Sequence, residues 1–281
     1  MNEIDVEHKL YPKRLRKINK TPKKLYINGN INLLNSNCIS VVGSRKNTKY
    51  GERWCKKFVK EFINYDLTIV SGMALGIDKI AHETAIKSGG KTIAVLPSGL
   101  ENIYPKENLE LYNEILLNGG CIVSEYEPYE EANSKRFLER NRIVSGLSIG
   151  ILVAEAAYRS GTSVTAKIAK AQGKDVFCIP GSLDSPKSIG TNKLIKEFAT
   201  MVTSPEDIIN NYKFLHKKEN IQNILIEELP KEYQKIYNLV TDVPINVNDI
   251  VRKSLLELKD VSSKLTMLEL DGKVVKLPGN M

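Results

Sequence analysis

The sequence is poor in the residues that build metal sites, disulfides and membrane spans. It has four cysteines, three histidines and one tryptophan in 281 residues, and no two cysteines form a C-x-x-C pair. A structural zinc site needs about four clustered Cys or His ligands, so we expect no metal. No apolar run approaches the roughly 18 residues of a membrane span. The opening residues, MNEIDVEHKLYPKR, lack the apolar core of a secretory signal. These absences predict a cytoplasmic protein.

Two common nucleotide-binding motifs are also missing. No G-x-G-x-x-G follows the first predicted strand, and the second predicted strand ends in Ser71-Gly72, where an acidic residue would bind a ribose. No complete G-x-x-x-x-G-K-[ST] motif is present. These observations argue against NAD and ATP as cofactors, and we expect no cofactor.

The net charge of +8 favours nucleic acid as a partner, but its distribution is uneven. Residues 1–24 carry eight Lys or Arg against three acidic residues, whereas residues 213–281 carry eleven against ten. Little of the excess positive charge lies between these two segments. A nucleic-acid surface in the centre of the chain must therefore depend on local arrangement rather than on total charge.

Short β-branched runs alternate with amphipathic helical patterns from residue 38 to about residue 200, which predicts a Rossmann-like α/β domain with a doubly wound, mostly parallel sheet. The predicted strands are 38–43, 67–72, 91–96, 121–125, 148–155 and 175–180. Helices are predicted over 77–88 and 107–118, around Trp54, Phe58 and Phe62, and after Ser160 and Pro186. The helix after Ser160 is expected to bury Val164, Ile168 and Ala171, which recur at helical spacing.

The remaining segments complete a division of the chain into four parts. Residues 1–37 form a basic N-terminal segment before the Rossmann-like domain, 38–212. Residues 213–224 are polar and aperiodic and are expected to be a linker. Residues 225–281 contain three short amphipathic patterns followed by a turn sequence, DGKVVKLPG, at 271–279. Three helices and a hairpin are typical of a small winged-helix domain.

Glycine-rich turns lie where several predicted strands end. The first strand ends in Gly43-Ser44-Arg45, the second ends in Ser71-Gly72, and a later helix opens with Gly161-Thr162-Ser163. In an open parallel sheet, ligands bind at the carboxyl ends of the strands. Backbone N–H groups of such turns and helix N-termini bind phosphate. We therefore predict a phosphate-binding edge, although any one of these glycines is equally explained by the turn alone.

A second candidate site is the segment SKRFLERNR, residues 134–142. It contains three arginines, Lys135 and one aromatic residue, Phe137, offset by a single glutamate. Cations interleaved with a stacking face suit single-stranded nucleic acid. The competing explanation is a solvated helix face with Phe137 buried in the core, which is the commoner origin of a charged run.

Across residues 39–200 the sequence resembles the DNA-processing protein A family, also called Smf. The matching segments include ISVVGSRKNTKYG, IVSGMALGIDKIAHETAI, IAVLPSGLENIYP, FLERNRIVSGLS and AEAAYRSGTSVTAKIAKAQGKDVFCIPG, in the family's order. The resemblance implies a non-enzymatic, single-stranded-DNA-binding homodimer that protects incoming DNA during natural transformation and loads RecA recombinase. The DNA site that it implies, together with the phosphate edge, comprises Gly43, Ser44, Arg45, Ser71, Gly72, Lys135, Phe137, Arg140, Asn141, Arg142, Gly161, Thr162 and Ser163.

Two other functions are disfavoured by the sequence. Nucleoside-monophosphate phosphoribohydrolases of the lysine decarboxylase-like kind carry a P-G-G-x-G-T-x-x-E loop, but Thr165 stands where their catalytic glutamate would be, and a threonine supplies no carboxylate. A transcription regulator led by the winged helix is disfavoured because residues 259–271 hold two lysines against three acids. Longer family members begin with a helical SAM-like domain, which we do not expect here because 37 residues precede Cys38.

Overall fold

The computed structural model describes residues 1–218, 230–240, 244–271 and 274–277. The chain divides into two compact units, Met1–Lys217 and Lys218–Met281. Within the described ranges, no helix is both long enough and apolar enough to cross a membrane.

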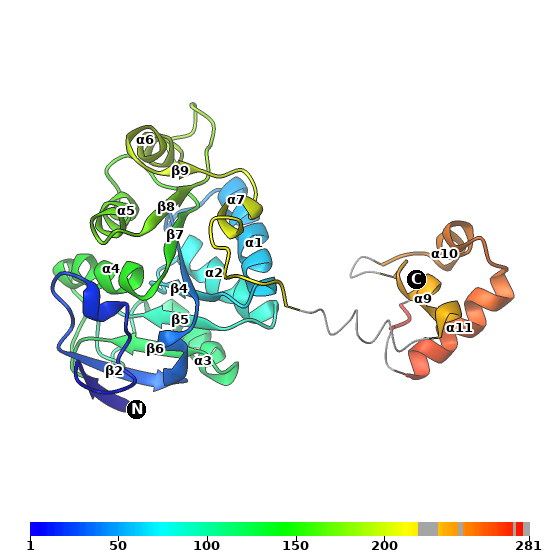
Figure 1. Cartoon of the computed structure of the whole chain (residues 1–281), viewed down its shortest axis with the longest axis horizontal. Helices are drawn as coiled ribbons and strands as arrows, with labels where there is room; N and C mark the ends of the chain where they lie inside the picture. Colours follow the sequence, from blue (N-terminus) through cyan, green and yellow to red (C-terminus); the bar gives the residue numbers. More distant parts are fainter. Residues whose placement is uncertain (219–229, 241–243, 272–273, 278–281) are drawn as a thin grey trace. The chain divides into compact units, whose positions relative to one another are not determined.

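The first unit is built on a nine-stranded sheet with the order β1-β2-β6-β5-β4-β3-β7-β8-β9 (Figure 1). The pairs from β6 through β9 are parallel, whereas β2 pairs antiparallel with both β1 and β6. This confirms the predicted α/β fold class. The strands are β1 (Asn2–Asp5), β2 (Lys24–Gly29), β3 (Cys38–Val42), β4 (Thr68–Ser71), β5 (Thr92–Val95), β6 (Cys121–Ser124), β7 (Gly150–Val153), β8 (Asp175–Cys178) and β9 (Thr200–Met201).

Helices cover both faces of this sheet (Figure 1). One face packs against α4 (Ser134–Leu147), α5 (Gly161–Ala171) and α6 (Ile189–Glu197). The other packs against α1 (Lys49–Asn64), α2 (Ile77–Lys87) and α7 (Glu206–Ile209), with α3 (Leu109–Leu117) beside β5 and β6. Short 3-10 helices occur at Leu15–Lys17, Ile31–Asn35 and Lys106–Asn108.

The central strands are apolar along their whole length because both of their faces are buried. In β3, Val41 packs with the α1 and α2 side, and the next residue, Val42, packs with the α4 and α5 side. Strand β4 repeats this alternation with Ile69 and Val70. All four cysteines are free and buried, and burial raises the pKa of Cys38 to about 11. The thiols therefore serve as small apolar side chains.

The N-terminal 37 residues belong to the sheet rather than forming a separate basic segment. Strands β1 and β2 lie in it, and β2 pairs with β6 through Tyr26 opposite Ser124. Tyr11 and Leu15 are fully buried in the same core cluster as the helices α4 and α5. Apolar residues spaced among the lysines and arginines of this segment anchor it to the core.

The predicted buried face of the helix after Ser160 is wrong. Val164 is 38% exposed, and Ala171 is also exposed. The residues that α5 buries are Thr165, Ala166 and Ala169. These small residues suit the close packing of α5 against α4, which the periodicity of larger apolar side chains does not indicate.

The second unit contains α9 (Lys231–Tyr237), α10 (Val247–Ser254) and α11 (Leu258–Leu270). They pack around a small core of Ile236, Ile250, Val261 and Leu268. Three helices at the predicted places fit the winged-helix expectation. The expected hairpin at 271–279 and the linker at 213–224 fall partly outside the described residues, and residues 274–277 contain no strand.

Candidate functional site

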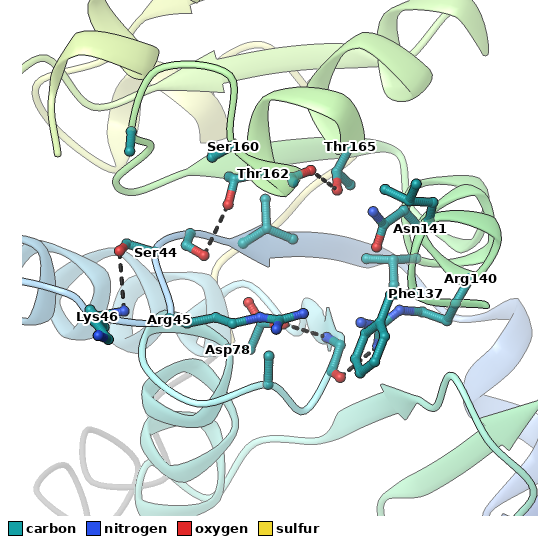
Figure 2. A pocket seen from close by; sticks show the side chains of 18 of the residues that line it. Ser44, Arg45, Lys46, Asp78, Phe137, Arg140, Asn141, Ser160, Thr162 and Thr165 are labelled. Atoms are coloured by element: carbon teal, nitrogen blue, oxygen red, sulfur yellow. Dashed lines mark hydrogen bonds between the residues drawn. The ribbon is translucent and has the colours of Figure 1, made fainter. Parts of the chain in front are cut away.

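A pocket opens at the carboxyl edge of the sheet, where the chain order reverses between β3 and β7. It has a volume of about 520 Å³, which lies in the range of small-ligand sites. Its walls come from the loop after β3, the loop and helix start after β7, and the N-terminal half of α4 (Figure 2). This is the topological switch point of the sheet, the place where open α/β folds bind ligands.

The loop after β3 is held in place from two sides. The Ile77 N–H donates to Ser44 O at 3.2 Å, which ties the start of α2 to the loop. The Thr162 hydroxyl of α5 donates to Gly43 O at 3.0 Å (Figure 2). Gly76 precedes α2 with φ of 80°, and a Cβ there would collide with Ser44 O. These contacts fix the backbone that carries Arg45.

Arg45 reaches across the pocket to an aromatic pair. Its guanidinium carbon lies 4.9 Å from the centre of the Phe137 ring, and Figure 2 shows the two side chains side by side. The Tyr104 ring meets Phe137 edge-on with centroids 5.5 Å apart, and it is 47% exposed. Phe137 is only partly buried and belongs to no core cluster of the described residues. A charged group and an accessible ring surface thus share one wall.

Arg140 lies at the base of the pocket and is committed to the protein itself. It is 4% exposed, and its Nη1 donates to Gly72 O at 2.5 Å and to Val95 O. A Cβ on Gly72 would strike this guanidinium, so glycine allows the close approach of Arg140 to the loop. Burial lowers the pKa of Arg140 to about 10, with the Asp78 charge opposing the shift. The side chain therefore remains protonated at neutral pH and braces the loop after β4.

Among the described residues, Asp78 on the first turn of α2 supplies the one carboxylate that lines the pocket. It is 7% exposed and accepts the Gly72 N–H at 3.1 Å. Burial raises the pKa of Asp78, while the nearby Arg140 charge and backbone N–H groups oppose that change. The arrangement gives the Gly72 loop a second brace.

The remaining wall favours anions. Gly161 and Thr162 place the N-terminus of α5 at the pocket, where unpaired N–H groups and the helix dipole attract negative charge. Lys46 and Lys187 also line the pocket, and the sequence patterns did not single them out. Both follow the carboxyl end of a strand, so the switch-point rule could have found them. Arg45 and these two lysines together outnumber Asp78, the one carboxylate in the described lining of the pocket.

The structure brings together nine of the thirteen residues expected at the site, and these are Gly43, Ser44, Arg45, Gly72, Phe137, Arg140, Asn141, Gly161 and Thr162. The other four do not line the pocket. Ser71 is fully buried and donates to Val41 O at 2.6 Å, and Ser163 donates its N–H to the N-cap hydroxyl of α5. Lys135 pairs with Glu139 at 3.7 Å.

Arg142 points away from the pocket. Its guanidinium makes a two-pronged contact with Glu125, with N–O distances of 2.7 and 2.6 Å, and also donates to Lys20 O. The ion pair is largely shielded, with side chains 16% and 15% exposed. Arg142 therefore fastens α4 to the loop after β6 and to the N-terminal segment.

Thr165, which stands where the alternative enzyme class has its glutamate, lies in the pocket wall. Its hydroxyl donates to Gly161 O at 3.1 Å, inside the first turn of α5. A hydroxyl engaged in this way offers neither a base nor a carboxylate nucleophile. The pocket geometry thus gives no support to glycosidic hydrolysis at this position.

Sequence comparison shows the family of the chain. The profile of a family described as DNA recombination-mediator protein A matches residues 2–213, and that of the DprA winged helix domain matches residues 225–280. The chain belongs to the DNA-processing protein A family. Protein Smf of Escherichia coli is 36% identical over 282 residues, covering 98% of this chain and 75% of that protein. DNA processing protein DprA of Streptococcus pneumoniae is 43% identical over 204 residues, covering 73% and 72%.

Solved structures of the family show the same architecture. The X-ray structure of DNA processing protein A from Streptococcus pneumoniae matches with a TM-score of 0.72 and 40% identity, over 76% of this chain and 75% of that one. A structure of the Helicobacter pylori protein matches with a TM-score of 0.69 and 33% identity, over 77% and 98%. The latter was described for its single-stranded DNA binding mode.

Proposed function

We propose that the chain binds single-stranded DNA in the pocket between β3 and β7. The observation that carries this proposal is the pairing of the Arg45 guanidinium with the Phe137 ring on one pocket wall. A guanidinium matches a phosphate, and an accessible ring stacks on a base without regard to sequence. The single-stranded DNA binding mode described for the Helicobacter pylori relative supports the same assignment.

The anion-binding elements complete the site. A phosphate held by Arg45 would lie within reach of the α5 N-terminus at Gly161 and Thr162, which line the same pocket. A base leaving that phosphate would meet Phe137, with Tyr104 extending the aromatic surface. Double-stranded DNA keeps its bases stacked inside the helix, so the ring would be useful only with a single strand.

The test is a competition experiment with a labelled oligothymidylate. Unlabelled single strand should displace it, duplex should displace it less well, and AMP should not displace it at matched concentration. Arg45→Ala should weaken binding, whereas Lys170→Ala, which removes an exposed charge from the last turn of α5, should not. If AMP displaced the oligonucleotide as well as the single strand does, the pocket would be a nucleotide site instead.

The finer roles are proposed from family membership. We propose that the protein acts in the cytoplasm as a homodimer, protects DNA taken up in natural transformation, and loads RecA recombinase on the bound strand. RecA filament assembly on a strand already covered by this protein tests the last step. Assembly should be faster than on DNA covered only by a competing single-strand-binding protein, and equal rates would contradict the proposed loading. Equilibrium sedimentation tests the dimer.

A further inference from the structure

The outward face of α1 is basic and aromatic over three turns. Its buried side is formed by Cys55, Phe58, Val59 and Phe62. The residues of the opposite side are spaced three and four apart, and they are exposed except for Trp54, which is half-buried and packs partly against the core. We call it the α1 basic face, and it consists of Lys49, Tyr50, Arg53, Trp54, Lys57 and Lys60.

Two cations of this face, Arg53 and Lys57, lie against its rings. The Arg53 guanidinium is 5.9 Å from both the Tyr50 and the Trp54 ring centres, and Lys57 Nζ is 4.8 Å from that of Trp54. The two rings are 6.2 Å apart and tilted, and Tyr50 is 37% exposed. Alternating positive charges and partly exposed rings match what a flexible single strand offers, phosphates and unstacked bases.

The positive charge of the face is not cancelled. Of the two glutamates on α1, Glu52 pairs with Lys56, and Glu61 pairs with Lys217 at 3.6 Å. In the part of the chain that the structure describes, no carboxylate lies within ion-pair distance of Arg53, Lys57 or Lys60. These charges are available to an anionic partner.

The face begins at the pocket. Lys46 lines the pocket, and α1 starts three residues later, at the edge of the sheet where β3 ends. The Tyr50 hydroxyl donates to Pro180 O at 2.7 Å, which fastens the first turn next to the end of β8. From Lys49 to Lys60 the helix extends for about 16 Å, at about 1.5 Å per residue. A strand leaving the pocket past Lys46 would meet these charges in succession.

We propose that the α1 basic face is a second contact surface for single-stranded DNA, used by the part of the strand that extends beyond the pocket. This inference rests on the proposed function of the pocket. It predicts that a short oligonucleotide engages the pocket alone and that a longer one engages both surfaces.

Trp54 makes the proposal directly observable, because it is the one tryptophan of the chain. Oligothymidylates of about 5 and about 16 nucleotides, spanning the site sizes of single-strand-binding domains, would be titrated while Trp54 emission is recorded. The test variant is Arg53→Gln with Lys57→Gln. The matched control is Lys87→Gln with Lys170→Gln, which removes two exposed charges from the last turns of α2 and α5, at the opposite edge of the sheet.

The long oligonucleotide should quench Trp54, and the short one should not. The Arg53 and Lys57 double variant should lose the quenching. It should also lower the slope of log K against log salt by up to about 1.4 for the long oligonucleotide, at about 0.7 for each lost phosphate contact, and leave the short one unchanged. The control should behave like the wild type.

Three results would overturn the inference. Equal quenching by both lengths would mean that Trp54 emission responds to binding in the pocket and not to contact of DNA with the face. An unchanged salt slope for the long oligonucleotide would mean that the face contacts no DNA, as expected of a surface for an acidic protein. Full binding of the long oligonucleotide without quenching of Trp54 would also mean that the face contacts no DNA. Failure of both lengths to bind the wild type would instead contradict the proposed function.

Discussion

Helices α1 and α4 each carry a dense group of basic residues with an aromatic side chain, yet the two groups serve different ends. On α4, Lys135 and Arg142 are paired with Glu139 and Glu125, and Arg136 is paired with a glutamate of the preceding loop. On α1, Arg53 and Lys57 lie against rings and, within the described residues, have no carboxylate partner. The density of positive charge in a sequence therefore does not identify a binding surface.

The α4 segment still contributes the central element of the site. Phe137 alternates with the paired cations and points toward Arg45 instead of into the core (Figure 2). Its neighbour Arg140 is buried and braces the Gly72 loop. Arg140 and Arg142 thus hold α4 in place, and the aromatic residue among the basic ones lines the pocket.

Among the substitutions on α1 and α4, the largest loss of folding stability should come from Arg140. Arg140→Met leaves Gly72 O and Val95 O without a donor and Asp78 without its nearby positive charge. We expect the free energy of unfolding to fall by about 3–5 kcal/mol, the range for breaking a buried charged contact. Urea denaturation measures it. An equal loss for Lys170→Met, an exposed residue expected to change stability by no more than about 0.5 kcal/mol, would contradict this account.

A smaller loss is expected for the shielded ion pair of α4. Arg142→Gln removes both hydrogen bonds to Glu125 and should lower stability by about 1–3 kcal/mol, while leaving oligonucleotide affinity unchanged. Glu125→Gln should have a similar cost, and the double variant should cost less than the two single changes together. Weaker DNA binding by a folded Arg142→Gln protein would show that this arginine also reaches the strand.

The smallest effect on folding is expected on α1. Arg53→Met loses only exposed contacts with Tyr50 and Trp54, which are worth about 0.5–1 kcal/mol. Thermal and urea unfolding should place it close to the wild type, even though binding of long oligonucleotides becomes less dependent on salt. A loss as large as that of Arg142→Gln would mean that the α1 cations stabilise the fold instead of serving a ligand.

The sequence predicted the parts of the molecule that depend on local pattern. The strands from β3 to β8 and the helices α1, α2, α3, α5 and α6 follow from β-branched runs and helical spacing, whereas α4 was not predicted as a helix. The pocket residues Gly43, Arg45 and Gly161 follow from the rule that ligands bind where parallel strands end. Each of these inferences needs only residues that are close in the chain.

The parts that were missed depend on partners far apart in the sequence. Strand β2 joins the sheet through β6, nearly a hundred residues later. Arg142 is neutralised by Glu125, and Arg140 is buried because it reaches the loops after β4 and β5. The buried face of α5 is chosen by close packing with α4. No local periodicity carries this information.

The central claim is that Arg45 and Phe137 act together on a single strand, and a thermodynamic cycle of oligonucleotide binding at two or more salt concentrations tests it most directly. Arg45→Ala should flatten the salt dependence by about 0.7 for one lost phosphate contact. Phe137→Ala should cost about 1–3 kcal/mol with little change in that slope. Because the two side chains lie 4.9 Å apart, the double variant should depart from additivity by about 0.5–3 kcal/mol. Variants that remain folded and bind with wild-type affinity and salt dependence would contradict the claim.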